Sequence, residues 1–231
     1  MALIEIHDLT RCFGSGNACA WALNGIDLEI ERAAWCVLEG RSGSGKTTLL
    51  NIIGTLDSPT SGSLRVAGTE LGGLAAPERN GFRLRHLGFV FQAYNLMAVL
   101  DARENVAYPL QLRGWKRDAA LARADEWLAR VGLDGLTHRR PHELSGGQQQ
   151  RVAVARALAG EPDLILADEP TANLDSHTAG SLIELMQSLN QDIGTTFVIA
   201  SHDPAVIAST DGPNGHRVTL QDGKVAASEC K

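Results

Sequence analysis

Apolar and polar residues alternate over short stretches in the first and last parts of the chain, and this period of two predicts β-strands. The clearest early examples read LIEIHD and IDLEI. Two later stretches, DLILAD and TTFVIAS, are almost continuously apolar, which is typical of buried strands. The final stretch, RVTLQDGKV, predicts a hairpin because its Asp-Gly pair suits a tight turn. The strands are expected at residues 3–8, 26–30, 34–40, 64–67, 87–92, 163–168, 195–201 and 217–225.

The centre of the chain has a different pattern and contains no good strand between about residues 102 and 160. In RDAALARADEWLARVG the apolar residues recur every three or four positions, so they lie on one face of a helix that ends at Gly132. Further helices are expected after the glycine loop at 40–45 and over 178–190. The residues of the predicted apolar face are Leu121, Ala124, Trp127, Leu128 and Val131.

Strands that flank a helical insertion predict an α/β fold with an all-helical lobe. The length of 231 residues fits a single domain over 1–231 with one inserted lobe. We expect the core over about 1–92 and 161–231 and the lobe over about 93–160. The opening MALIEIHDLT has no signal-peptide pattern, and no run of about 18 apolar residues occurs. These features predict a soluble, cytosolic protein.

Charge and cysteine spacing exclude some functions. The net charge of −6 argues against a dedicated nucleic-acid binder. The four cysteines have no C-x-x-C spacing, so we expect neither a disulfide framework nor a zinc site, and all four should be reduced. They are Cys12, Cys19, Cys36 and Cys230.

The segment GRSGSGKT matches the pattern G-x-x-x-x-G-K-[ST] and lies between a predicted strand and a predicted helix. In this motif backbone N–H groups and a helix N-terminus surround phosphate oxygens. The lysine reaches the terminal phosphates, where it also serves catalysis, and the threonine hydroxyl binds magnesium. A glycine-rich turn without a ligand is the alternative, but it does not explain the strand and helix on either side. The predicted phosphate-binding residues are Gly40, Arg41, Ser42, Gly43, Ser44, Gly45, Lys46, Thr47 and Thr48.

The apolar strand LILAD ends in two adjacent carboxylates, Asp168 and Glu169. Strand alternation points them in different directions, so they should have different roles. Asp168 is expected to hold the magnesium shell, and Glu169 to accept a proton from the water that attacks the γ-phosphate. Acids at a helix N-terminus before Pro170 are the alternative interpretation.

The segment LSGGQQQRVAVARAL starts with a serine and two glycines and runs directly into a helix, which is an arrangement suited to an anion. A serine N-cap would account for Ser145 but not for two glycines. The upstream phosphate loop already places one helix N-terminus on the phosphates. A second one is useful only if it meets the γ-phosphate from the opposite side.

Together with LILADEPTANLD, this segment resembles the signature and acidic-strand segments of the ATP-binding cassette (ABC) ATPases, over about residues 3 to 225. The resemblance implies a P-loop NTPase core with an antiparallel β subdomain and an inserted all-helical subdomain. It also implies that ATP and Mg²⁺ bind, and that the chain is a homodimer in the ATP-bound state. In that dimer the signature of one subunit caps ATP on the phosphate loop of the other. The signature residues are Ser145, Gly146, Gly147 and Gln148.

Other positions match the family one at a time. Phe13 falls where the family has an aromatic ring that stacks on adenine, although tyrosine is usual there. Trp21 is a substitute candidate for this stacking role. The alternative is that Phe13 belongs to the hydrophobic core. Gln92 matches the glutamine that touches magnesium and the attacking water. Asp175 matches an acidic residue along the dimer seam, and His202 the switch histidine that contacts the γ-phosphate.

Within the family, GTLDSPTSG and NLMAVLDARENVAYPL look most like lipoprotein-releasing, macrolide-exporting and cell-division ATPases. The resemblance implies the motor subunit of an ABC-type membrane export or mechanotransmission complex, held by an integral membrane permease at the cytoplasmic face of the membrane. The uncharged segment AYNLMAVL lacks a helical period and predicts a docking site for that partner. The core of the helical lobe is the alternative place for its side chains. The predicted docking residues are Tyr94, Leu96, Met97 and Leu100.

Two other functional classes remain for comparison. A soluble ABC ATPase of DNA repair or translation normally has two cassettes in one chain, or a coiled-coil or zinc insertion, and the sequence shows none of these. A nucleotide-binding scaffold that does not hydrolyse is disfavoured because Lys46, Asp168, Glu169 and His202 are all present. We therefore expect an ATP hydrolase that has no nucleic-acid partner.

Overall fold

The computed structural model describes residues 2–14 and 19–230, and its strands form two sheets. The smaller sheet is antiparallel, in the order β2-β1-β4-β5. The larger has the order β10-β9-β3-β8-β7-β6, and only β10 runs antiparallel to its neighbour. The strands are β1 Ala2–Phe13, β2 Ala20–Glu31, β3 Trp35–Glu39, β4 Ser61–Val66, β5 Thr69–Glu70, β6 Leu87–Phe91, β7 Leu164–Asp168, β8 Thr196–Ala200, β9 Gly215–Gln221 and β10 Lys224–Cys230.

The helices cover both faces of the larger sheet and fill the centre of the chain. Short 3₁₀ turns at Asp134–Leu136, Pro141–Glu143 and Ser209–Asp211 connect some of them. Within the described residues, no helix combines the length and the apolar character that a membrane span requires. The α-helices are α1 Lys46–Ile53, α2 Ala76–His86, α3 Ala102–Leu112, α4 Arg117–Arg130, α5 Gly146–Leu158, α6 Ser176–Ile193 and α7 Pro204–Ala208.

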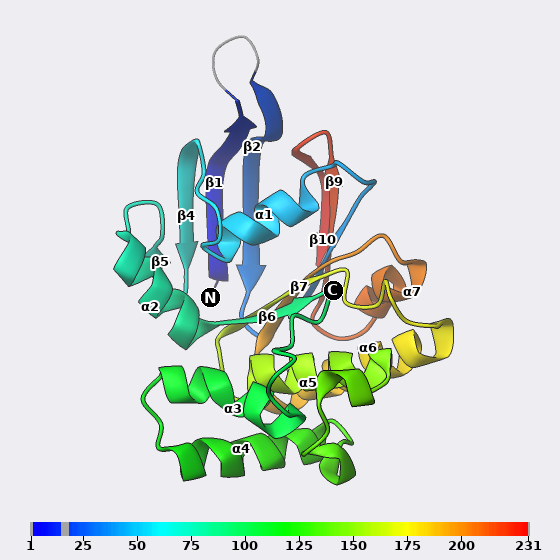
Figure 1. Ribbon diagram of the computed structural model, residues 1–231. Coiled ribbons are helices and arrows are strands. Elements are labelled where there is room, and N and C mark those ends of the chain that lie inside the picture. Colours follow the sequence, from blue (N-terminus) through cyan, green and yellow to red (C-terminus); the bar gives the residue numbers. More distant parts are fainter. Residues whose placement is uncertain (1, 15–18, 231) are drawn as a thin grey trace.

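The larger sheet separates two hydrophobic clusters, because successive side chains of a strand point to opposite faces. In β7, Leu164 and Leu166 join the cluster that contains α1 and the smaller sheet. Ile165 and Ala167 join the cluster that contains α5, α6 and the other central helices. Figure 1 shows the smaller sheet at one end of the molecule and α3 and α4 at the other, with α5 beside β6 and β7.

The predicted helical face of the central region is confirmed. Trp127, Leu128 and Val131 are fully buried, as are the alanines on the same side of α4, while Leu121 packs against the cluster partly buried. The helix ends at Arg130, and Gly132 follows with a φ of 75°, a left-handed conformation that suits glycine. The final hairpin is also confirmed, since Asp222 and Gly223 both have positive φ between β9 and β10.

The sequence pattern missed α2, because this helix is largely polar and buries only one of its residues, Phe82, so it has no apolar face of several residues to recognise. It also placed the end of a strand at Gln92, whereas β6 ends one residue earlier, at Phe91. Helix α6 is longer than the expected 178–190, because Asp175 caps it and Gly194 ends it with a φ of 72°.

The expectation that all four cysteines are reduced is wrong for two of them. Cys12 and Cys19 form a disulfide between the end of β1 and the residue before β2, with their Cα atoms 5.7 Å apart. Antiparallel pairing of β1 with β2 brings the two ends together, which the spacing of cysteines along the sequence does not reveal. Cys36 is buried and free, and Cys230 is exposed and free.

Candidate active site

A cleft of about 980 Å³ opens at the carboxyl ends of the parallel strands of the larger sheet. Strand β3 leads there into the phosphate loop, residues 40–47, and β6, β7 and β8 end nearby. Parallel strands present their carboxyl ends at one edge, so residues far apart in sequence meet there. The predicted site residues that line this cleft are Gly40, Arg41, Ser42, Gly43, Gly45, Lys46, Thr47, Thr48, Gln92, Glu169 and His202.

The phosphate loop can adopt its path only because two of its residues lack side chains. Gly40 has a φ of 152° and Gly45 a φ of 106°, and both lie against other backbone segments. A Cβ atom at Gly45 would lie 2.6 Å from the carbonyl oxygen of Ala22, and one at Gly40 would overlap the carbonyl oxygen of Leu220. Gly45 precedes α1, so the loop turns its backbone toward the start of a helix.

Lys46 is 7% exposed and its ammonium group is held by the loop itself. Its Nζ donates to the carbonyl oxygens of Gly40, at 2.7 Å, and Arg41, at 3.2 Å. These two contacts curl the side chain back over residues 40–45, at the floor of the cleft. A cation in this position neutralises phosphate oxygens that the loop surrounds.

Thr47 and Asp168 form the part of the site whose chemistry fits magnesium. The hydroxyl of Thr47 donates to Oδ1 of Asp168 at 3.2 Å, which joins the start of α1 to the end of β7. Burial raises the pKa of Asp168, and the neighbouring Glu169 charge adds to this, while the Thr47 hydrogen bond and the Lys46 charge oppose it. A hydroxyl and a carboxylate are hard oxygen ligands, so this pair is suited to a divalent cation.

Glu169 is held in a strained and well-defined position. Its φ is 45°, unusual for a residue other than glycine, and its N–H donates to the Ala200 carbonyl at 2.9 Å. Its two carboxylate oxygens have separate partners: the hydroxyl of Ser201 donates to Oε2 at 3.1 Å, and Nδ1 of His202 lies 2.7 Å from Oε1. The side chain of Glu169 is only 19% exposed, against 71% for His202. The histidine therefore shields and orients the carboxylate from the open side.

The signature segment, residues 144–148, lies outside the cleft that its own chain forms. Ser145 caps α5 by accepting from the Gln148 N–H at 3.3 Å, and Gln148 Oε1 accepts from the Ser145 N–H at 2.9 Å. The two glycines also have neighbours within the chain. A Cβ at Gly146 would lie 2.8 Å from the Tyr94 hydroxyl, and one at Gly147 would overlap the side chain of Thr178. Close packing within the chain therefore explains why both positions are glycine, an explanation that the sequence did not suggest.

The other expected contacts to the nucleotide or the dimer seam do not line the cleft either. Phe13 is 47% exposed, and Arg11 lies over its ring at 4.6 Å, while Trp21 is 54% exposed on the neighbouring strand. Asp175 caps α6 by accepting from the N–H groups of His177 and Thr178. Hydrogen bonds from Thr178 lower the pKa of Asp175, which keeps this exposed carboxylate charged.

The cleft also includes residues that the sequence did not predict, namely Ala22, Glu39, Ile207 and Thr219. Glu39 is the last residue of β3 and precedes Gly40, so its place at a strand end was a usable signal. Thr219 donates to Oε1 of Glu39 at 2.5 Å and belongs to β9. No local pattern marks Thr219 or Ile207, because only sheet pairing and α7 packing bring them to the site.

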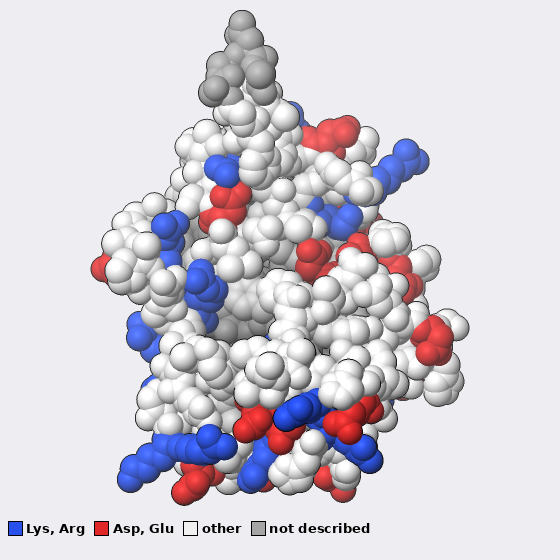
Figure 2. Space-filling model, viewed as in Figure 1, with Lys and Arg blue, Asp and Glu red and all other residues white. Residues whose placement is uncertain are grey.

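A second cavity, of about 570 Å³, lies between α2, β6 and α3, and we call it the lobe groove. Figure 2 shows the surface hollowed there, between the half with the sheets and the helical end, with basic side chains at its edge. Tyr108 and Leu112, 40% and 56% exposed, are two of its apolar lining residues, and Arg83, Arg113 and Arg156 also contribute to the lining.

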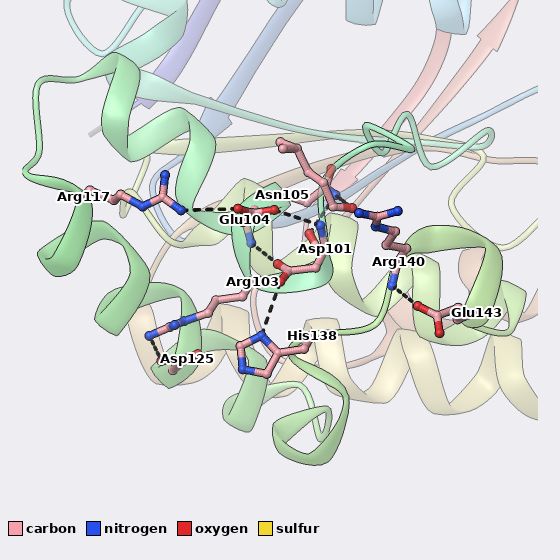
Figure 3. Close-up of polar contacts among 10 residues, drawn as sticks. Asp101, Arg103, Glu104, Asn105, Arg117, Asp125, His138, Arg140 and Glu143 are labelled. Carbon is pink, nitrogen blue, oxygen red and sulfur yellow. Dashed lines mark hydrogen bonds and ion pairs between the residues drawn. The ribbon is translucent and has the colours of Figure 1, made fainter.

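Of the predicted docking residues, Met97 lines the lobe groove, Leu96 packs against the helical core, and Tyr94 is close to Gly146. Asn105 on α3, which is fully buried, holds this segment in place. It accepts from the Met97 N–H at 2.8 Å and donates to the carbonyls of Met97, Leu100 and Asp101. Asp101 caps α3 and also contacts His138, and Figure 3 shows these contacts meeting at the start of the helix.

Comparison with known proteins gives the family. The family model described as "ABC transporter" matches residues 23–172. The chain is 45% identical to a lipoprotein-releasing system ATP-binding protein LolD of Geobacter metallireducens, over 98% of this chain and 99% of that protein. It is 43% identical to a macrolide export ATP-binding/permease protein MacB of Mannheimia succiniciproducens, over 97% of this chain. The chain spans about a third, 34%, of the length of that MacB protein.

Solved structures agree with this result. A dimeric structure of the ATP-binding cassette MJ0796 in a post-hydrolysis state, bound to ADP and Pi, is 38% identical and has a TM-score of 0.88 over 98% of both chains. Another dimeric MJ0796 cassette structure matches equally well. The cleft with its phosphate loop, the Thr47–Asp168 pair and the Glu169–His202 pair thus lies in a fold shared with a cassette that binds the products of ATP hydrolysis. The chain belongs to the ABC transporter family and is an ATP-hydrolysing cassette.

Proposed function

We propose that this ATPase is the motor subunit of an ABC-type membrane export or mechanotransmission complex, and that it works as a head-to-tail homodimer closed by ATP. One observation carries the proposal: Ser145 caps α5 outside the cleft that contains Lys46 and Glu169. A helix N-terminus with free N–H groups is an anion site, and within one chain it faces no phosphate loop. A second copy related by a two-fold axis supplies one, and two composite sites result.

The cleft residues have distinct roles in this proposal. Lys46 neutralises the terminal phosphates from the loop side, and Gln92, which also lines the cleft, orients the attacking water, as the family resemblance implies. Glu169 accepts the proton of that water at a carboxylate oxygen, and His202 holds the carboxylate in line through its 2.7 Å contact. Thr47 and Asp168 are the ligands expected for magnesium, with Gln92 as a third, and the ion supplies charge neutralisation at the phosphates when bound.

The nucleotide base is expected against the ring of Phe13, with Trp21 as the substitute. Both rings are about half exposed, at 47% and 54%, which leaves a face of each open for stacking. Asp175, with a lowered pKa at the N-terminus of α6, would lie along the dimer seam with its charge retained.

The partner is proposed to be an integral membrane permease that docks in the lobe groove. The LolD relative is named as the ATP-binding protein of a lipoprotein-releasing system, and the name of the MacB relative, an export ATP-binding/permease protein, includes a permease. Large exposed apolar side chains at a groove between two layers suit an inserted helix. Of the predicted docking residues, Met97 lines the groove, and so do Tyr108 and Leu112, which the sequence did not predict. Docking there would hold the cassette at the cytoplasmic face of the membrane.

The composite site is tested with Ser145→Arg. A long cation at the start of α5 should block the γ-phosphate of the partner copy and leave the cleft of its own chain intact. We expect ATP affinity of the monomer to change little and turnover to fall on the order of 10²-fold, the usual loss for a group that stabilises transition-state charge. Nucleotide binding by fluorescence and phosphate release measure the two quantities.

The matched control is Ser188→Arg, which places the same cation on the exposed side of α6. It should leave both binding and turnover unchanged. Unchanged turnover in Ser145→Arg would contradict the composite site, and a lost monomer affinity would mean that the signature segment serves its own chain.

A further inference from the structure

Gln150 is a fully buried amide in α5 that bridges two other segments of the active site. Its Nε2 donates to the carbonyl oxygen of Pro170 at 2.7 Å and to that of Phe91 at 3.3 Å. Pro170 directly follows Glu169, and Phe91 directly precedes Gln92. The side chain of Gln150 is therefore hydrogen-bonded to the backbone next to Glu169, the proposed general base, and next to Gln92, the residue proposed to orient the attacking water.

The orientation of this amide follows from its partners. Both are carbonyl oxygens, which only accept, so the amide nitrogen of Gln150 must face them. Its Oε1 is then buried without a hydrogen-bond donor anywhere in the described part of the chain. A buried acceptor without a partner is destabilising, so Gln150 is a poor choice for packing alone. Its favourable contribution is the bridge between the two carbonyls.

Neighbouring contacts extend the same connection. On the opposite end of α5, Arg156 donates to the carbonyls of Tyr94 and Asn95, two residues with φ of 58° and 50°. Asn173, just beyond Pro170, donates to the Gln92 carbonyl at 2.9 Å. The segment that starts at the end of β6 thus has four of its carbonyls bound by side chains, and three of these bonds come from α5. Movement of this segment without α5 would break the three hydrogen bonds that α5 makes to it.

In the composite-site dimer, the start of α5 and the backbone that Gln150 bridges lie at two different nucleotides. Ser145, at the start of α5, contacts ATP on the partner copy, whereas Gln92 and Glu169 act on ATP bound by their own chain. We propose that Gln150 is the positioning residue that couples the two nucleotide sites of the dimer, an inference that rests on the proposed function. When the partner's nucleotide draws the start of α5 toward it, the amide bridge moves the backbone beside Gln92 and Glu169. Such a coupling is reciprocal.

The test is Gln150→Met, which keeps the length of the side chain and removes both hydrogen bonds. The rate of ATP hydrolysis is measured against ATP concentration in excess magnesium and fitted for the Hill coefficient, which lies between one and two for two coupled sites. The Hill coefficient of the parent chain should exceed one. For typical coupled sites, the first nucleotide changes the affinity for the second by a factor of about 5 to 150. In Gln150→Met we expect this factor, and with it the Hill coefficient, to fall to about one.

The control is Gln187→Met on α6, which removes a comparable bond from Nε2 to the Ser209 carbonyl, at 2.9 Å, away from the cleft. It should keep the parent coefficient even if its thermal midpoint falls. If Gln150→Met does not fold, Gln150→Asn replaces it, because the shorter amide cannot span both carbonyls, and the same loss of coupling is expected.

Two results overturn the inference: a parent coefficient of one, or a Gln150 variant that keeps the parent coefficient and changes only stability. Failure of the proposed function is seen separately. If Ser145→Arg hydrolyses ATP at the parent rate, the composite site itself is wrong, whatever the Gln150 variants do.

Discussion

Replacement of Glu169 by glutamine should separate ATP binding from hydrolysis. Gln has the same shape, and its amide can keep both partners, since the Ser201 hydroxyl and Nδ1 of His202 can each donate or accept. The exchange of one oxygen for nitrogen should change the free energy of unfolding by only about 1 kcal/mol. The loss of a general base instead costs a factor on the order of 10² to 10⁴ in rate. At about 1.4 kcal/mol per tenfold, this raises the barrier by about 3 to 5 kcal/mol.

The barrier effect exceeds the stability effect, so ATP should bind and the closed dimer should accumulate. Phosphate release measures the rate, and light scattering with ATP and magnesium measures the mass of the particle. Glu184→Gln, an exposed glutamate of α6, is the control and should hydrolyse like the parent. The reasoning is refuted if Glu169→Gln remains monomeric under these conditions, or if it hydrolyses ATP at the parent rate.

Two other predictions concern the lobe groove and pH. Leu112→Glu should weaken association with the permease at least about tenfold, because docking would bury a charge, with ATP binding unchanged. Leu56→Glu, at an apolar residue 49% exposed outside both the groove lining and the segment AYNLMAVL, should associate like the parent; equal association of both variants would reject the groove. Burial lowers the pKa of His216 from its ordinary 6.5, so the unfolded chain binds more protons and stability should be lost as pH falls through about 6.5. His216→Gln should flatten the fall in thermal midpoint between about pH 8 and pH 5.5, and an equally steep fall would contradict the assignment.

The chemistry of the cleft could be predicted from the sequence wherever backbone conformation and side chain act locally. The phosphate loop is such a case, because glycines at positive φ, a lysine and the start of a helix follow one another in a few residues. The acidic end of β7 is another, since a nearly continuous apolar run can only be a buried strand or helix, and two acids follow. The helical face of α4 was also readable, because helical periodicity is a property of the chain alone.

Tertiary structure decided what no local pattern contains. The mostly polar α2 and the Cys12–Cys19 disulfide depend on which segments pack side by side. The sequence predicted a groove from Met97 and Leu96 together, but packing turned Leu96 into the helical core and left Met97 in the lining. The hydrogen bonds of Gln150 join it to Phe91 and Pro170, which are 59 and 20 positions away in the sequence. Residue type and spacing thus determined which groups are present, whereas the pairing of strands and the packing of α5 against β6 determined which of them touch.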